Sequence, residues 1–318
     1  MELSTKLRGM THDHRSTRLD GAGANTIAAF FDLDGTLIPG SANIPLAKAA
    51  FRAGMMTPKE LAKDLRNGVS FILKGATDER SEQVRDRILA AVEGYPAAQV
   101  EALADSFMAA LVDSVEPTMQ QVLDEHADRH EDRIVLSASP TEIVSRFAAE
   151  VGLEHGTGTT SERDADGVYT GRLVGPFCYR EGKVAVMRQL AADYGYDLTK
   201  SYAYSDSVSD LPMLAAVGHP VAVNPEPALR DLAADRGWPI IETSATPRSR
   251  LTSFAGITRL ARTVAAGTAS GAASVTAAAL NAAADSVRSA ARTGRQLAIK
   301  GAQAKTSKRL SLSDAHHG

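Results

Sequence analysis

The spacing of hydrophobic residues along this 318-residue chain predicts strands and helices in alternation. Short, largely apolar runs suit parallel strands that are covered on both faces of a sheet. They are found at 27–30, 133–140, 201–205 and 220–223. Helices are predicted between them, for example over 141–151 and 181–194. Strands that alternate with helices form right-handed βαβ units, so we expect an α/β fold with a doubly wound parallel sheet.

A long helical segment interrupts this alternation after the first strand. Helix starts recur along it, each with a capping residue or a proline at the beginning. They lie at Thr57, Thr77, Pro96 and Pro117. An insertion of roughly ninety residues is large beside the ordinary connections of α/β domains. We therefore predict a helical cap over 41–130, inserted into a core domain that consists of 26–40 and 131–244.

The bulk composition is that of a soluble globular protein, with 44% hydrophobic and 23% charged residues. No apolar stretch approaches the ~20 residues that are needed to span a bilayer. The segment 1–25 is polar and glycine-rich, so it is predicted to be a disordered leader rather than a secretory signal. The single cysteine, Cys178, excludes an internal disulfide and favours a reducing, cytoplasmic location.

The net charge of −3 hides a strong asymmetry between the body and the end of the chain. The segment 245–318 carries eight Arg and three Lys against two Asp, which gives +9 and leaves −12 for the rest. This Ala/Ser/Arg-rich tail is predicted to be either a solvated helix or a disordered extension. A basic amphipathic tail can also bind an anionic membrane surface peripherally or contact an acidic partner. These alternatives stay open, and no specific nucleic-acid partner is predicted.

Two aspartates follow the first predicted strand, in the sequence Asp32-Leu33-Asp34-Gly35-Thr36. In an open α/β sheet the carboxyl ends of the strands line the binding crevice. Aspartate is depleted in strands and costly to bury without a partner. The pair therefore indicates a bound cation, a nucleophile or both, although the two residues alone would also fit a capped turn.

Further polar residues fall at the predicted ends of other strands and helices. Ser137 ends the second strand, Lys183 opens a helix, and Asp206 and Asp210 follow the third strand. Each has an ordinary alternative, because an aspartate often caps a helix and a first-turn lysine is commonly solvated. Taken together, they are expected to meet the two aspartates in one crevice.

The order and chemistry of these motifs resemble those of the haloacid dehalogenase (HAD) superfamily over about 26–242. The helical insertion after the first motif is similar to that of subfamily IB, which includes the phosphoserine phosphatases. The resemblance implies a Rossmann-like HAD core with an all-helical cap. It also implies a magnesium-dependent phosphatase that hydrolyses a small phosphorylated metabolite, a phosphate monoester, through an aspartyl-phosphate intermediate.

The resemblance gives the four aspartates their expected roles. Asp32 is expected to be the nucleophile, and Asp34 to protonate the leaving oxygen and then activate water. Mg²⁺ is expected to bind Asp32, Asp206 and the main-chain carbonyl of Asp34. Asp210 would support the metal shell or hold the lysine. A carboxylate can attack phosphate once a metal ion offsets the negative charges, and Mg²⁺ takes few protein ligands and retains several waters.

The resemblance also implies that Ser137 and Lys183 bind the phosphoryl group. Ser137 is preferred to Ser139 because the family's hydroxyl is usually the first one after the strand. Lys183 is preferred to the nearby Arg180 because a glycine–lysine pair opens the predicted helix.

The family pattern fails at three positions, Ser41, Ser205 and Ser209. Phosphoserine phosphatases typically carry a glutamate nine residues after the nucleophile, where this chain has Ser41, so the usual reader of a substrate ammonium group is missing. Ser205 and Ser209 also replace the usual glycine and asparagine of the last motif. The phosphatase class follows from the motifs, whereas serine specificity does not.

The open alternatives are a phosphoserine phosphatase proper, a phosphotransferase to an acceptor other than water, and a phosphatase-like scaffold that binds a membrane or a protein through its tail.

Overall fold

The computed structural model describes residues 27–55, 85–86, 89–90 and 92–243. The predicted leader over 1–25, the basic tail over 245–318 and the helix starts at Thr57 and Thr77 lie outside the described residues. None of the helices in the described ranges is long and apolar enough to cross a membrane.

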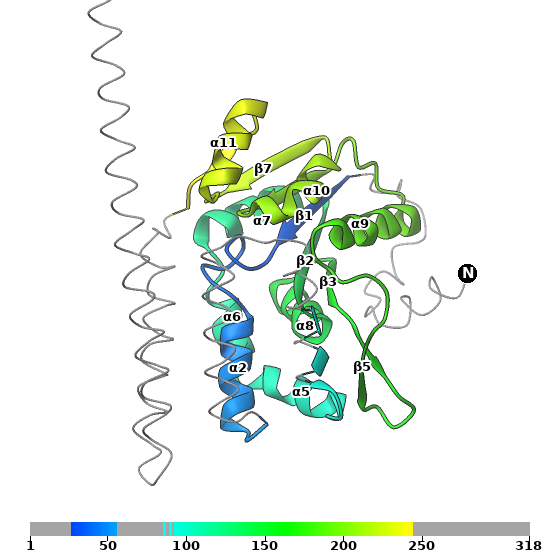
Figure 1. The fold of residues 1–318 in the computed structure, drawn as a ribbon. Helices are drawn as coiled ribbons and strands as arrows, with labels where there is room; N and C mark the ends of the chain where they lie inside the picture. The colour runs from blue at the N-terminus through cyan, green and yellow to red at the C-terminus, as the bar shows by residue number, and fades with distance from the viewer. Residues whose placement is uncertain (1–26, 56–84, 87–88, 91, 244–318) are drawn as a thin grey trace, which may run out of the picture. The chain divides into compact units, whose positions relative to one another are not determined.

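Six parallel strands form the central sheet, in the order β3–β2–β1–β6–β7–β8 (Figure 1). Their bounds are β1 (Ala28–Asp32), β2 (Asp132–Pro140), β3 (His155–Thr159), β6 (Tyr202–Ser205), β7 (His219–Val223) and β8 (Ile240–Ile241). All five residues of β1 are buried, because β1 has a neighbouring strand on each side and helices above and below. Residues 28–30 of the apolar run at 27–30 thus belong to a fully covered strand, as the pattern predicts.

Helices cover both faces of this sheet. One face carries α7 (Pro117–Asp128) and α8 (Thr141–Val151), and the other carries α9 (Glu181–Tyr194), α10 (Leu211–Ala215) and α11 (Pro227–Arg236). Side chains alternate along a strand, so Phe31 packs in the cluster with α7 and α8, while Phe30 packs with α9, α10 and α11. The predicted α/β fold with a doubly wound parallel sheet is therefore confirmed.

The helices that fall within the predicted cap range, 41–130, occupy different surroundings. They are α2 (Asn43–Arg52), α5 (Ala97–Asp105), α6 (Met108–Val112) and α7. The last of these packs against β2 and buries Met119 and Leu123 in the cluster that contains Phe31. Helix α7 therefore lies on the central sheet, although it belongs to the range predicted as the cap.

A hairpin outside the main sheet joins α5 to the core. Its strands, β4 (Ser161–Arg163) and β5 (Tyr169–Leu173), pair antiparallel. Tyr169 of β5 and Gly167 of the hairpin turn form main-chain hydrogen bonds with residues 94–97, where α5 begins. Arg163 donates hydrogen bonds to Glu101 of α5 and to Glu142 of α8, both at 2.8 Å. This arginine thus links a helix of the predicted cap range to a helix of the core.

Candidate active site

Asp32 is the last residue of β1, and the chain turns back directly after it. Gly35 has a φ of +88°, a conformation that glycine adopts without strain, and the N–H of Leu37 donates to the carbonyl of Leu33. Both leucines are completely buried. Because these leucines anchor the turn in the core, the polar residues between them stay at the end of the strand.

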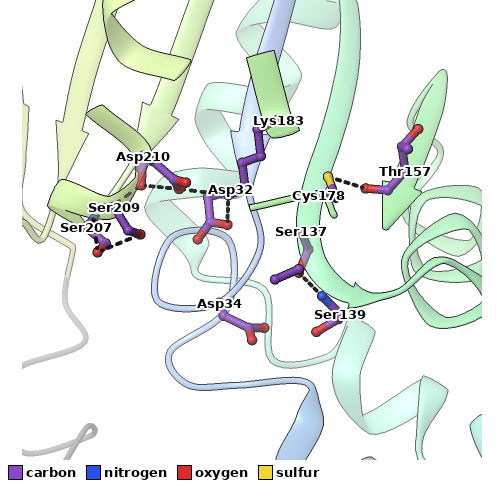
Figure 2. Close-up of polar contacts among 12 residues, drawn as sticks. Asp32, Asp34, Ser137, Ser139, Thr157, Cys178, Lys183, Ser207, Ser209 and Asp210 are labelled. Atoms are coloured by element: carbon purple, nitrogen blue, oxygen red, sulfur yellow. Dashed lines mark hydrogen bonds and ion pairs between the residues drawn. The ribbon is translucent and has the colours of Figure 1, made fainter. Parts of the chain in front are cut away.

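Lys183, from the first turn of α9, joins two of the predicted site residues. Its Nζ donates to Oδ1 of Asp32 at 2.6 Å and to Oδ2 of Asp210 at 2.8 Å (Figure 2). The side chains of Asp32, Lys183 and Asp210 are 11%, 3% and 3% exposed. Ser205, one of the two departures in the last motif, donates through Oγ to the same Asp210 oxygen at 2.7 Å. Three segments that are distant in the sequence therefore meet at one point.

Asp206 lies against the turn after β1. A Cβ atom added to Gly35 would lie 2.4 Å from Oδ2 of Asp206, so only glycine leaves room for this carboxylate. The main-chain carbonyl of Asp206 accepts a hydrogen bond from the N–H of Glu226, whose carboxylate accepts from the N–H of Val208. These bonds fix the loop that carries Asp206. We refer to Asp32, Asp206, Asp210 and Lys183 as the carboxylate cluster.

The charges in the carboxylate cluster shift one another's protonation. Burial raises the pKa of the Asp32 carboxyl well above its usual range; Lys183 lowers it, and the carboxylates of Asp210 and Asp206 raise it again. Burial alone would lower the pKa of Lys183, but Asp210 and Asp32 raise it by more, so this ammonium stays charged. The carboxylate cluster thus contains three carboxyl groups and one cation, Lys183.

The donors of the carboxylate cluster fit a hard cation such as Mg²⁺. Oδ1 of Asp210 is buried and has no hydrogen-bond partner among the described residues. Within the described ranges, no three His, Cys, Asp or Glu side chains are close enough to hold an ion by themselves. Mg²⁺ needs no such cage, because it is commonly bound by one or two carboxylates and keeps several waters. The arrangement suits Mg²⁺ better than an ion that requires a full set of protein ligands.

Ser137 and Ser139 lie at the carboxyl end of β2, beside the end of β1 (Figure 2). The strand register sets Asp32 opposite Leu136, the residue before Ser137. The Oγ of Ser137 accepts a hydrogen bond from the N–H of Ser139 at 3.1 Å. The buried Oγ of Ser139 has no hydrogen-bond partner in the described part of the chain. Both hydroxyls are thus brought to the strand end that carries Asp32.

Asp34 is held by the segment that leads into α2. Ser41 donates through Oγ to Oδ2 of Asp34 at 2.6 Å, and the N–H of Ala42 donates to Oδ1 at 2.9 Å. Burial raises the pKa of Asp34, and these two donors offset part of that rise. The motif pattern marks Ser41 only as a missing glutamate, so this contact is not predicted. The one signal in the sequence is a hydroxyl residue seven positions after Asp34.

Comparison with known proteins gives one family and several relatives. Residues 29–215 match the family model described as haloacid dehalogenase-like hydrolase. A Mycobacterium tuberculosis protein named as a phosphatase is 38% identical over 221 residues, which cover 68% of this chain and 75% of that protein. The phosphoserine phosphatase SerB1 of the same organism is 35% identical over 219 residues, or 68% of this chain and 70% of that protein. A crystal structure of a Bordetella pertussis protein of unknown function is 30% identical with a TM-score of 0.61, and the match covers 68% of this chain and 98% of that one.

Proposed function

This chain belongs to the haloacid dehalogenase-like hydrolase family, and we propose that it is a Mg²⁺-dependent phosphatase that hydrolyses a small phosphate monoester through an aspartyl-phosphate intermediate. The observation that carries the proposal is the bonding of Lys183 to Asp32 and Asp210 at the strand end. A buried site with more carboxylates than cations suits a divalent ion and a dianionic phosphoryl group. The relatives that are named as phosphatases support the same class of reaction.

In the first half of the proposed reaction, an oxygen of Asp32 attacks phosphorus while the bond from phosphorus to the leaving oxygen breaks. Asp34 donates its proton to that oxygen, so the alcohol leaves neutral and Asp34 becomes ionised. Mg²⁺, bound through Asp32, Asp206 and the carbonyl of Asp34, would offset the charge of the phosphate and the carboxylates. Ser137 and Lys183 hold the phosphoryl oxygens.

In the second half, Asp34 accepts a proton from water, and the water oxygen attacks the phosphorus of the aspartyl phosphate. The bond between phosphorus and the Asp32 oxygen breaks, which restores the carboxylate and releases inorganic phosphate. Asp210 keeps Lys183 beside the phosphoryl group through both halves, and the Ser205 hydroxyl holds Asp210. After one cycle Asp34 is protonated again and Asp32 is a free carboxylate, as at the start.

The proposed substrate is a small phosphorylated metabolite whose alcohol part is not assigned. The relative named phosphoserine phosphatase SerB1 supports a small-molecule substrate. Ser41, which stands where phosphoserine phosphatases typically carry glutamate, argues against transferring serine specificity to this chain. A cytoplasmic location, and a membrane or acidic partner for 245–318, stay predictions, because that tail lies outside the described residues.

The test is phosphate release from a broad panel of phosphate monoesters, with and without Mg²⁺. The Asp32→Asn variant should lose at least about 10³-fold in kcat/KM on every substrate that the wild type hydrolyses. Asp235→Asn is a matched control, because Asp235 is an exposed residue of α11. Equal activity of Asp32→Asn and the wild type would overturn the mechanism, and Mg²⁺-independent turnover would overturn the metal requirement.

A further inference from the structure

Asp34 is the only expected participant in the chemistry whose two carboxylate oxygens are both bonded, within the described residues, by one short segment. Ser41 Oγ contacts Oδ2 at 2.6 Å, and the Ala42 N–H contacts Oδ1 at 2.9 Å. The two donors are adjacent in the chain, and α2 begins at the next residue, Asn43. The direction of this carboxylate is therefore set by the first residues of the predicted cap range.

We propose that Ser41 is a positioning residue that aims the Asp34 carboxylate at the leaving oxygen and ties that aim to the position of α2. This inference rests on the proposed function, in which Asp34 transfers the proton. It gives a role to the serine that replaces the family's glutamate: the side chain serves the acid–base residue instead of reading a substrate ammonium group.

The chemistry of the hydroxyl suits this task. A serine hydroxyl can donate to Oδ2 of Asp34 in both protonation states, because a protonated carboxyl keeps acceptor capacity while its own proton stays free for the leaving oxygen. The Ala42 N–H can only donate, and an ionised glutamate at position 41 could only accept. Ser41 can therefore keep its contact with Asp34 in both halves of the reaction, whereas glutamate would repel the ionised carboxylate at this short distance.

The surrounding backbone makes this contact sensitive to the position of α2. The Ser41 carbonyl accepts from the N–H of Ile44 at 3.1 Å, and its Oγ accepts from the N–H of Asn43 at 3.3 Å, so Ser41 is bonded to the first residues of α2. Ala42 is 1% exposed and packs in the core cluster. The return connection from the cap range is bonded here too, because the N–H of Glu116 donates to the carbonyl of Leu37 at 2.9 Å. A shift of α2 would therefore change the direction of Asp34.

The test compares two kinds of substrate that differ in how much they need the acid. An alkyl phosphate has a strongly basic leaving oxygen and needs its proton, whereas 4-nitrophenyl phosphate releases a stable phenolate without one. The Ser41→Ala variant should lose roughly 10- to 100-fold in kcat/KM for the alkyl ester, part of the 10²–10⁴-fold that acid–base catalysis supplies. Its kcat/KM for the nitrophenyl ester should stay near the wild-type value. This ratio depends only on the steps up to the first irreversible one, the release of the phenolate, which does not need the acid.

Three further variants complete the series. Ser41→Thr keeps the hydroxyl and should restore the alkyl-ester activity, and Ser41→Glu should lose more than Ser41→Ala. Ser106→Ala is the matched control, because it removes an exposed hydroxyl whose one hydrogen bond within the described ranges is to the main-chain carbonyl of Leu103. Thermal unfolding of each variant shows whether it is folded. If Ser41→Ala does not fold, the comparison of Ser41→Thr with Ser41→Glu still tests the role of the hydroxyl.

The outcomes separate this inference from the proposed function. Equal losses on both esters in Ser41→Ala, or alkyl-ester activity in Ser41→Glu at the wild-type level, would overturn the role of Ser41. If the role of Ser41 is overturned but the wild type is active and Asp32→Asn is inactive, the proposed function is still supported. Wild-type protein without phosphatase activity, or an active Asp32→Asn variant, would overturn the proposed function itself.

Discussion

The carboxylate cluster contrasts with a second polar group, which we call the histidine cluster. Its members are His126, Glu131 and Tyr204, which are buried, and Arg129, whose side chain is 45% exposed. His126 is completely buried, with Nδ1 2.5 Å from Oε2 of Glu131 and Nε2 2.8 Å from the Tyr204 hydroxyl. Arg129 donates to the same Glu131 oxygen at 3.0 Å. One cation here faces one anion, and both ring nitrogens of the histidine are bonded.

The two clusters differ in how far their charges are balanced. Buried polar groups are normally paired, because an unmade hydrogen bond or an isolated charge is costly. The histidine cluster follows this rule. The carboxylate cluster departs from it, since three carboxylates accompany one ammonium and an Asp210 oxygen has no partner among the described residues. The imbalance indicates a ligand site, whereas the balanced cluster indicates a structural role.

The largest effect is expected from removing the single cation of the carboxylate cluster. Lys183→Met should lower kcat/KM by at least about 10²-fold, because the proposed charged donor to the phosphoryl group is lost. It should also reduce the free energy of unfolding by roughly 3 kcal/mol, since two buried carboxylates lose their partner. Kinetics and urea unfolding measure the two effects. Lys200→Met, at an exposed lysine, is the control, and equal effects of the two substitutions would contradict the contrast.

A smaller effect is expected from the metal ion. If the excess carboxylates bind Mg²⁺, the ion should stabilise the folded protein by about 2.7 kcal/mol at a concentration of 100 Kd. Thermal unfolding over a Mg²⁺ series would measure this effect without any substrate. Asp206→Asn should lose most of the stabilisation, whereas Asp235→Asn should keep it. An equal stabilisation by Mg²⁺ in both variants would show that Asp206 does not bind the metal ion.

The balanced cluster should respond in the opposite way. His126→Phe keeps a ring of similar shape but leaves Glu131 and the Tyr204 hydroxyl without this partner, so it should cost about 2 kcal/mol of stability. The kcat/KM of the folded variant should change little, because the cluster bonds no expected substrate contact. His219→Phe, at an exposed histidine stacked on Tyr202, is the control. A large loss of activity with unchanged stability would reverse the assignment of the two clusters.

The smallest expected effect is a pH dependence of stability. Burial lowers the pKa of His126 below its ordinary value of 6.5; the contact with Glu131 opposes this shift, and Arg129 adds to it. The unfolded chain then takes up the proton at a higher pH than the folded chain. Stability from His126 is present above pH 6.5 and is lost as the pH falls, by at most about 1.4 kcal/mol per unit.

Urea unfolding on both sides of pH 6.5 tests this dependence. The wild type should lose more stability on the acid side than His126→Phe does. An identical loss in the two proteins would show that another group is responsible.

Local patterns predicted much of the fold but not the contacts between elements. Helices α8 and α9 occupy the predicted ranges, and α9 ends where Gly195 takes a φ of +78°. Strand β3 has no apolar run to reveal it. A Cβ atom at Gly156 would lie 2.5 Å from the carbonyl of Val144, so this glycine lets α8 approach the strand. Such a close approach is a tertiary contact that no local pattern contains.

The same division applies to the site. Asp32, Lys183 and Asp210 could be expected together, because strand ends and helix starts of an α/β fold meet at one edge of the sheet. The hydrogen bond from Ser41 to Asp34 could not be expected from the sequence, since it depends on the turn at Gly35 and on the packing of the chain before α2. The position of α7 was equally hidden, because amphipathic spacing shows that a helix has an apolar face but not which surface receives it.

A nucleophile in the carboxylate cluster would carry the phosphoryl group during turnover, so the decisive experiment locates that group on the protein. Acid quenching followed by peptide mass spectrometry should find one phosphoryl group on the peptide that contains Asp32. The label should increase in Asp34→Asn with an aryl phosphate, because the second half of the reaction lacks its base. It should be absent in Asp32→Asn. Turnover without a phosphorylated protein, or with the label on another residue, would show that Asp32 is not the nucleophile.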